Sequence, residues 1–272
     1  MVTFLQEIKQ LQQICENKDQ IRLKLNEELL QTRNRDDRYQ LLRYEDGVLI
    51  AFLGIYPFGN KVELTGMVHP DHRRKGLFTR LFNEAILRVR QEGKENILLN
   101  TPKNSLSGQA FLKSVPCKLE TTEYQMKWER MDLLRSEDVK VRPSRGEDFP
   151  LEVELDRRCF GFSKQEAIQY NQEIRKDPAS QCLIIEFEGK PVGKIRTEEQ
   201  ENGTWIYGFA ILPEYQNRGI GRKALHLVTR MESERGKDVY LEVEAKNERA
   251  IALYKSSGYR VIQAQDYFRY TG

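Results

Sequence analysis

Apolar residues near the amino terminus recur with the spacing of an amphipathic helix. They are Phe4, Ile8, Leu11 and Cys15. The segment Thr3-Phe4-Leu5-Gln6 at their start fits a capping box, in which side chains satisfy free N–H groups of the first turn. The pattern therefore predicts an early helix, followed by the strands of this half.

In the second half, apolar runs predict strands that alternate with helices. Runs at 181–187 and 191–195 flank Glu188-Gly189-Lys190, which is typical of a hairpin turn. Further strands are expected at 205–212 and 239–245, helices at 220–231 and 248–256, and closing strands at 259–270. This order predicts an α/β (α+β) fold, a mixed sheet with helices on both faces.

The landmarks of these elements occur twice in the chain. Gly76 and Gly219 lie 143 residues apart, and Phe111-Leu112-Lys113-Ser114 matches Leu253-Tyr254-Lys255-Ser256 at a spacing of 142. Matches in register predict two similar domains in tandem. We place them at residues 1–132 and 139–272, joined by a short linker.

Charge and composition narrow the choice of partners. Lys and Arg number 44 against 41 Asp and Glu, and the net charge of +3 is spread along the chain. This balance leaves no basic footprint for nucleic acid or an anionic membrane, so neither is expected as a partner. No apolar run is long enough to span a bilayer.

The cysteines give no sign of a metal site or a disulfide framework. Cys15, Cys117, Cys159 and Cys182 are scattered, without a Cys-x-x-Cys pair, and the histidines lie at no ligand spacing. We therefore expect no metal. Free thiols are typical of a reducing compartment, which predicts a cytoplasmic protein.

The clearest chemistry lies in the segment from Ile211 to Arg222, where a strand ends before Pro213 and a helix begins near Gly219. Glycines let main-chain N–H groups approach an anion, and a helix start adds unpaired N–H donors and a positive dipole. Arg218 and Arg222 add positive charge. The segment is therefore expected to bind a diphosphate.

Two other interpretations of this segment are open. Residues 219–224 also fit the dinucleotide fingerprint G-x-G-x-x-G/A, with Glu242 about 20 residues further on, as that motif requires. Against this interpretation, the turn before Gly219 is long and too few residues follow for a complete dinucleotide domain. In the simplest alternative, the glycines only shape a loop.

The strand after this helix carries two carboxylates. Glu242 and Glu244 share one face, whereas Leu241, Val243 and Ala245 share the other. A solvated face is the ordinary explanation. Because charge in a central sheet is costly unless it serves a cleft, a general base is the alternative.

The next helix is well delimited. Asn247 is a natural N-cap and Gly258 a natural terminator. Tyr254, on this helix, either packs in the core or uses its hydroxyl to hydrogen-bond a reacting group such as a thiolate.

Together these residues resemble the GNAT superfamily of acyl-CoA-dependent N-acetyltransferases. The matching motifs are Gln216-x-x-Gly219-x-Gly221, the preceding Ala210-Ile211-x-Pro213, Leu241-Glu242-Val243, and Asn247-x-x-Ala250-x-x-Leu253-Tyr254 before Gly258-Tyr259. The detailed match lies in the second half, and the coarse pattern covers all of that half. The resemblance implies two GNAT-like domains in tandem, with acetyl-CoA as co-substrate.

The resemblance also implies roles for individual residues. The main chain from Arg218 through Gly219, Ile220 and Gly221 to Arg222 would hold the CoA diphosphate, with Gln216 and Asn217 shaping the turn. Ile211 would pair with the pantetheine arm and polarise the thioester, and Asn247 would hydrogen-bond the arm. Glu242 would deprotonate the amine through a water, with Glu244 as the substitute base, and Tyr254 would protonate the leaving thiolate.

The first half departs from the motif at three positions. Phe78 stands in place of Gly221, Asn100 in place of Glu242, and Leu112 in place of Tyr254. We interpret this half as a degenerate, non-catalytic copy that binds CoA, contributes to the acceptor pocket, or only stabilises its partner.

The leading hypothesis is an enzyme that moves an acetyl group to a primary amine of a small molecule or peptide. A non-catalytic acyl-CoA-binding sensor or scaffold is the alternative, and a nicotinamide-dinucleotide enzyme is a third possibility. The acceptor is expected near 156–170 and 263–267. There Glu152, Glu154 and Asp156 either attract a cationic amine or belong to ordinary helix packing.

Overall fold

The structure, a computed structural model, describes residues 3–58, 60–133 and 136–272. Leu134 and Arg135 of the expected linker lie outside the described residues. The chain divides into two compact units, the first made of Met1–Glu123 with Gln263–Gly272 and the second of Tyr124–Ile262. Two strands, β5 (Cys117–Trp128) and β11 (Tyr259–Tyr270), each contribute residues to both units.

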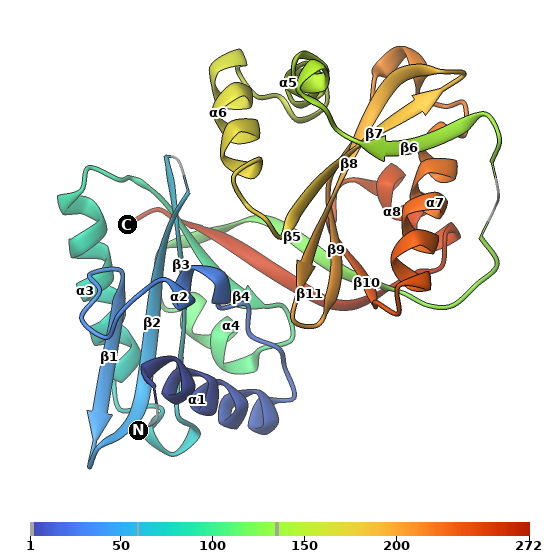
Figure 1. Ribbon diagram of the computed structural model, residues 1–272. Helices are drawn as coiled ribbons and strands as arrows, with labels where there is room; N and C mark the ends of the chain where they lie inside the picture. Colours follow the sequence, from blue (N-terminus) through green and yellow to red (C-terminus); the bar gives the residue numbers. More distant parts are fainter. Residues whose placement is uncertain (1–2, 59, 134–135) are drawn as a thin grey trace. The chain divides into compact units, whose positions relative to one another are not determined.

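The first unit is a mixed sheet with the strand order β1-β2-β3-β4-β11 (Figure 1). β3 and β4 are parallel, whereas β1 with β2, β2 with β3, and β4 with β11 through Gln265–Arg269 are antiparallel. Its elements are α1 (Phe4–Asp19), α2 (Glu27–Gln31), β1 (Gln40–Glu45), β2 (Val48–Phe58), β3 (Lys61–Val68), the 3-10 turn η1 (Pro70–His72), α3 (Leu77–Gln91), β4 (Asn96–Pro102) and α4 (Leu106–Leu112).

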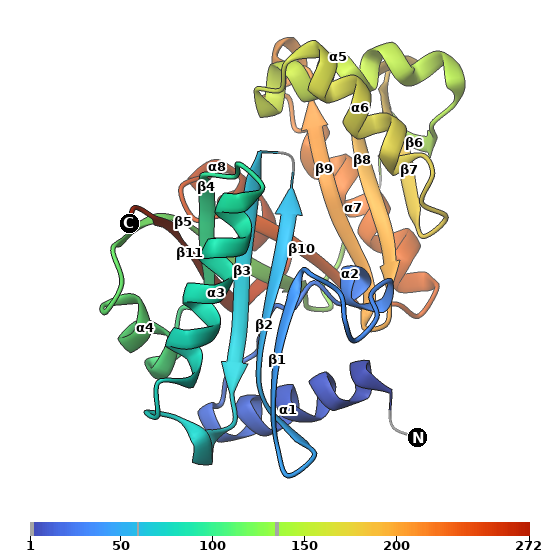
Figure 2. The same cartoon turned by 90° about the vertical axis from the view of Figure 1, so that its left-hand side faces the viewer.

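Helices cover both faces of this sheet (Figure 2). Successive residues of β2 point to opposite sides, and apolar side chains lie on both. Leu53 and Ile55 pack with residues of α3, whereas Phe52 and Tyr56 pack with residues of α1. The predicted capping box at Thr3 is present at the start of α1.

The second unit repeats this arrangement with the strand order β6-β7-β8-β9-β10-β5. The pairs are antiparallel from β6 to β9, and β9 and β10 are parallel. Its elements are β6 (Val139–Pro143), the 3-10 turn η2 (Gly146–Asp148), α5 (Phe149–Phe160), α6 (Lys164–Ile174), β7 (Ser180–Phe187), β8 (Lys190–Gln200), β9 (Gly203–Ile211), the 3-10 turn η3 (Pro213–Tyr215), α7 (Ile220–Glu234), β10 (Val239–Glu244) and α8 (Glu248–Ser256).

The apolar side chains of this sheet pack against α7 and α8. Ile206, Leu241 and Val243 form one core with Ala224 and Val228 of α7. The predicted α/β fold with helices on both faces is confirmed. The predicted helix at 248–256 matches α8, and the turn at Glu188 and Gly189 joins β7 to β8.

Candidate active site

The loop before α7 presents a helix start that no side chain caps. Gly219 has a left-handed backbone with φ +77°, and α7 begins at the next residue. The first-turn bond within the helix is from Lys223 N–H to the Gly219 carbonyl, at 3.1 Å. The N–H groups of Ile220, Gly221 and Arg222 precede this bond, and the first turn carries no acidic residue. This end of α7 is therefore suited to an anion.

The end of β9 presents a main-chain donor beside this loop. Leu212 N–H donates to Val192 O at 2.9 Å, so the preceding residue, Ile211, turns its N–H and C=O away from β8. The carbonyl of Ile211 accepts from Gln216 Nε2 at 2.8 Å and from Cys159 Sγ at 3.5 Å. Its N–H points the same way as that carbonyl, and both lie where β9 no longer pairs with β10.

The opening between β9 and β10 begins after Ile206 and Leu241, the last paired residues. Beyond this point β9 contains a bulge, because two residues, Gly208 and Phe209, are skipped where β8 skips one. Gly208 has φ +53°, a conformation that favours glycine. Bulges of this kind redirect main-chain groups and are common beside active sites.

Glu242 and Glu244 share a strand face, as predicted, but have different surroundings. Glu242 is half-buried, and its Oε1 accepts from Gln125 Nε2 of β5 at 2.8 Å. Glu244 pairs with Lys246 at 2.8 Å, and 42% of its side chain is exposed. The two carboxylates therefore differ in their partners, a neutral amide for Glu242 and a cation for Glu244.

Tyr254 lies in the core of the second unit and is 8% exposed. Burial raises the pKa of its hydroxyl to about 12. The hydroxyl is consequently protonated near neutral pH and able to donate a hydrogen bond.

The remaining predicted cofactor residues surround the same loop. Asn217 has a left-handed backbone with φ +61°. Gly221 lies close to β9 and α8. A Cβ built on it would meet Phe209, Ile211 and Leu253 at 3.5 to 4.0 Å, which is ordinary contact. Asn247 caps α8, as predicted, by accepting from Ala250 N–H at 3.1 Å.

The arginines of the loop are directed to different partners. Arg218 lies over the rings of Phe187 and Tyr215, at 4.7 and 5.6 Å from their centroids. Arg222 Nη1 reaches the carbonyl of Ser256 at 3.5 Å.

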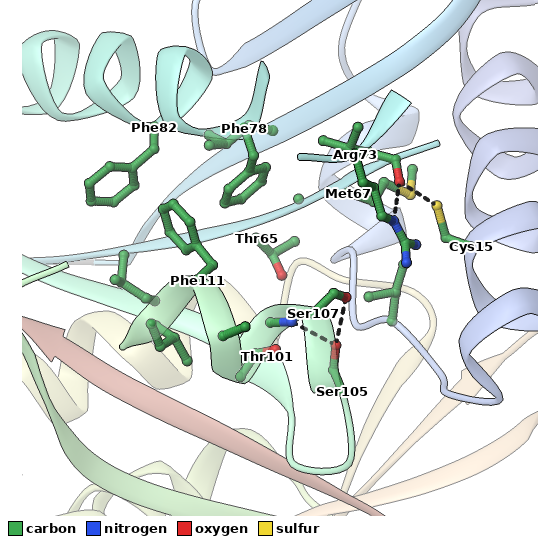
Figure 3. Close-up of a pocket in the computed structure, with 18 of the residues that line it drawn as sticks. Cys15, Thr65, Met67, Arg73, Phe78, Phe82, Thr101, Ser105, Ser107 and Phe111 are labelled. Atoms are coloured by element: carbon green, nitrogen blue, oxygen red, sulfur yellow. Dashed lines mark hydrogen bonds between the residues drawn. The ribbon is translucent and has the colours of Figure 1, made fainter. Parts of the chain in front are cut away.

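The first unit contains a cavity of about 410 Å³ at the matching place, where β3 and β4 stop pairing after Leu64 and Leu99 (Figure 3). The loop residues Arg73, Arg74 and Gly76 line it together with an apolar wall and several hydroxyls. The wall includes Phe78, Phe82 and Phe111, and the hydroxyls belong to Thr65, Thr101, Ser105 and Ser107. The sequence pattern does not predict this cavity, because its walls come from elements that are separate in the sequence, among them α1, β2, β3, α3, β4 and α4.

Of the two interpretations of the acidic residues of α5, the structure supports helix packing for Glu152 and Asp156. Glu152 and Asp156 are each 1% exposed. Glu152 pairs with Arg175 at 2.9 Å, and Asp156 with Lys194 at 2.7 Å. A buried carboxylate requires such a partner, so both groups are committed to packing α5 and α6 on the sheet.

Neither a metal site nor a membrane span emerges from the described residues. Within 3–58, 60–133 and 136–272, no group of three or more His, Cys, Asp or Glu side chains is placed to hold a metal ion. In the same ranges, no helix has the length and apolar character needed to cross a membrane.

The fold and this loop define the class of the protein. The model of the acetyltransferase (GNAT) family matches residues 5–114 and 150–259. The chain belongs to this family and contains two of its domains in tandem.

The curated relatives include N-acetyltransferases. The chain is 42% identical over 115 residues to the [ribosomal protein bS18]-alanine N-acetyltransferase of Escherichia coli, covering 41% of this chain and 74% of that protein. It is 41% identical over 68 residues to the N-alpha-acetyltransferase RimI of Mycobacterium tuberculosis, covering 25% of this chain and 42% of that protein.

Solved structures share the fold over nearly the whole chain. A GCN5-related N-acetyltransferase from Sphaerobacter thermophilus has a TM-score of 0.79 at 21% identity, covering 97% of this chain and 91% of that one. A tandem GNAT protein from the clavulanic acid biosynthesis pathway has a TM-score of 0.72 at 13% identity, covering 97% and 94%.

Proposed function

We propose that the chain is an N-acetyltransferase that moves an acetyl group from acetyl-CoA to a primary amine, with the chemistry in the second unit. The observation that carries the proposal is a difference between the repeats. Both keep the loop and the helix start, but only the second has Glu242 on the strand beside the opening and Tyr254 on the following helix. The first has Asn100 and Leu112 at these positions.

The cofactor would bind through main-chain groups of the second unit. The N–H groups from Gly219 to Arg222 would hold the CoA diphosphate at the start of α7. The N–H of Ile211, which faces the opening, would pair with the pantetheine arm and polarise the thioester carbonyl. The side-chain NH₂ of Asn247 would bind the same arm, since the oxygen of that side chain already accepts from Ala250 N–H.

The transfer itself would need a proton acceptor and a hydrogen-bond donor. Glu242 would take a proton from the acceptor ammonium through a water, so that the free amine attacks the thioester carbonyl. The tetrahedral intermediate would then collapse, forming the amide and breaking the C–S bond. The protonated hydroxyl of Tyr254 would protonate the departing thiolate, and the resulting phenolate would take back the extra proton from the nitrogen of the new amide.

The relatives suggest the acceptor to test first. The E. coli relative is named for an alanine of a ribosomal protein. We infer that the α-amine of a peptide with alanine at its amino terminus belongs in the first panel, beside small-molecule amines.

Turnover of acetyl-CoA, followed as released thiol, tests this function. The panel would contain an Ala-initiated peptide, the same peptide already acetylated at its amino terminus, a polyamine and an aminoglycoside. Thiol release with one free amine, but not with the blocked peptide, supports the transferase. Tight acetyl-CoA binding without turnover on any amine favours the sensor or scaffold.

A binding role without transfer is proposed for the first unit, since its cavity lies at the place that matches the opening of the second. Asn100 lines this cavity; among the described residues its buried Nδ2 has no hydrogen-bond partner, while Gln265 donates to its Oδ1. An acceptor group on a bound ligand would satisfy Nδ2. Two molecules of CoA bound per chain would support this role, and a single molecule bound only at the Gly219 loop would contradict it.

A further inference from the structure

Arg249 connects α8 to the loop before α7. It lies in the first turn of α8, and its guanidinium donates from Nη2 to Asn217 Oδ1 and from Nη1 to Gln216 Oε1, the latter at 3.4 Å. Gln216 in turn donates to the Ile211 carbonyl. The side chain of Arg249 therefore lies beside the loop that precedes the free N–H groups of α7.

The partners of Arg249 in these bonds are neutral amides, and the residue is exposed. The other cations near this helix start have different surroundings. Arg218 lies over two aromatic rings, and Lys223 pairs with Asp138 at 2.7 Å. Arg222 Nη1 reaches the carbonyl of Ser256, at the end of α8, at 3.5 Å. Within the described residues, the hydrogen bonds of Arg249 at the loop thus go to the amide oxygens of Gln216 and Asn217.

In the first repeat, the corresponding helix and loop are both bonded to a carboxylate, that of Asp19. Ser107 stands where the second repeat has Arg249, at the spacing of 142. The carboxylate of Asp19 accepts from Ser107 Oγ at 3.4 Å and pairs with Arg73 of the loop at 2.9 Å. The loop arginine there is neutralised, whereas the second repeat adds a cation.

We propose that Arg249 binds a phosphate group of the cofactor in the second unit, exchanging the amide oxygens of Gln216 and Asn217 for phosphate oxygens. This inference rests on the proposed function. A charge-assisted bond from guanidinium to phosphate is stronger than a bond to a neutral amide, so the exchange is favourable when the ligand arrives. Arg249 would thereby give the second unit a higher affinity for CoA than the loop alone provides.

Calorimetric titration of the full chain tests the proposal with three variants. Arg249→Ser copies the first repeat, Arg249→Lys keeps the charge, and Lys255→Gln removes one charge from the exposed far end of the same helix as a control. The second unit's site is identified as the one lost in Gly219→Phe. The ligands are acetyl-CoA and S-acetylpantetheine, which has the same arm without the diphosphate nucleotide.

We expect Arg249→Ser to raise the Kd for acetyl-CoA about tenfold, Arg249→Lys to raise it about threefold or less, and Lys255→Gln to leave it unchanged. The Kd for S-acetylpantetheine should be the same in all four proteins. An unchanged Kd for acetyl-CoA in Arg249→Ser overturns this inference but not the proposed function. An equal loss of affinity for both ligands does the same, because it would mean that Arg249 only stabilises the loop. No acetyl-CoA binding in the wild type at the Gly219 site overturns the proposed function, and this inference with it.

Discussion

Gln216 donates its side-chain amide to the main-chain oxygen of Ile211 at 2.8 Å, and the same bond recurs 143 residues earlier, where Arg73 Nε donates to Val68 O at 2.9 Å. Each of the two carbonyls also accepts from a helix thiol, of Cys159 or Cys15. The duplicated bonds hold the end of the strand and the loop in one conformation in both repeats. The conformation of the loop is thus common to both repeats. Differences in catalytic activity between the units must therefore come from the side chains around the loop.

Tyr254→Phe should lower kcat about 10- to 100-fold while the Kd for acetyl-CoA stays near that of the wild type. The ring keeps its place in the core, and only the hydroxyl that would meet the thiolate is lost. Steady-state turnover and calorimetry measure the two quantities. Unchanged kcat at saturating substrates would remove Tyr254 from the reaction.

Glu242→Gln should lower kcat/KM about 100-fold, because the amide cannot accept the proton of the acceptor ammonium. Glu244→Gln is the matched control on the same strand face. Glu244 is already paired with Lys246, so its variant should stay within about twofold of the wild type. The reverse ranking of the two variants would identify Glu244 as the base.

Gly219→Phe should weaken acetyl-CoA binding at least tenfold. A side chain at φ +77° strains the helix start by about 1–2 kcal/mol and places a ring beside the N–H groups. Gly236→Phe is the control, since Gly236 has φ +78° and equally open space at the far end of α7. Equal losses of affinity in both variants would mean that strain alone, and not the site, is responsible.

Alkaline pH should destabilise the wild type more than Tyr254→Phe. The folded pKa of about 12 lies above the ordinary value of 10.0, so this group stabilises the fold fully below pH 10 and loses that contribution as pH rises to about 12. The difference is roughly 2 kcal/mol. Urea unfolding at pH 9 and pH 12 measures it, and parallel losses in the two proteins would contradict the burial of this hydroxyl.

Lys194→Met should lower the free energy of unfolding by about 3–5 kcal/mol, because it leaves the Asp156 carboxylate buried without its cation. Adding Asp156→Leu should restore part of this loss, because the buried charge is gone, while Asn171 loses its bonds to both side chains and keeps the one to the Ala167 carbonyl. Urea denaturation of the single and double variants decides the matter. A double variant as unstable as the single one would show that packing, and not the uncompensated charge, causes the loss.

Features decided by neighbouring residues could be predicted from the sequence. Thr3 and Gln6 form the expected capping box, Asn247 caps α8, and Glu188-Gly189 turns the chain between β7 and β8. In each case the groups that satisfy one another lie within a few residues, so composition and spacing define the conformation.

Features that join distant segments could not be predicted in this way. Asp156 and Lys194 lie 38 residues apart, and only the packing of α5 against β8 shows that the carboxylate is buried. Gln265 belongs to the first unit because β11 pairs with β4, which no local periodicity encodes. The same holds for Arg249, whose partners precede it by more than 30 residues.

The most direct measurement is a crystal structure of the full chain grown with coenzyme A. The account predicts that the diphosphate lies against the main-chain N–H groups of Ile220 and Gly221 and that the pantetheine arm runs along Ile211 towards Tyr254. A structure in which this position is empty, or in which coenzyme A occupies only the cavity of the first unit, would contradict it.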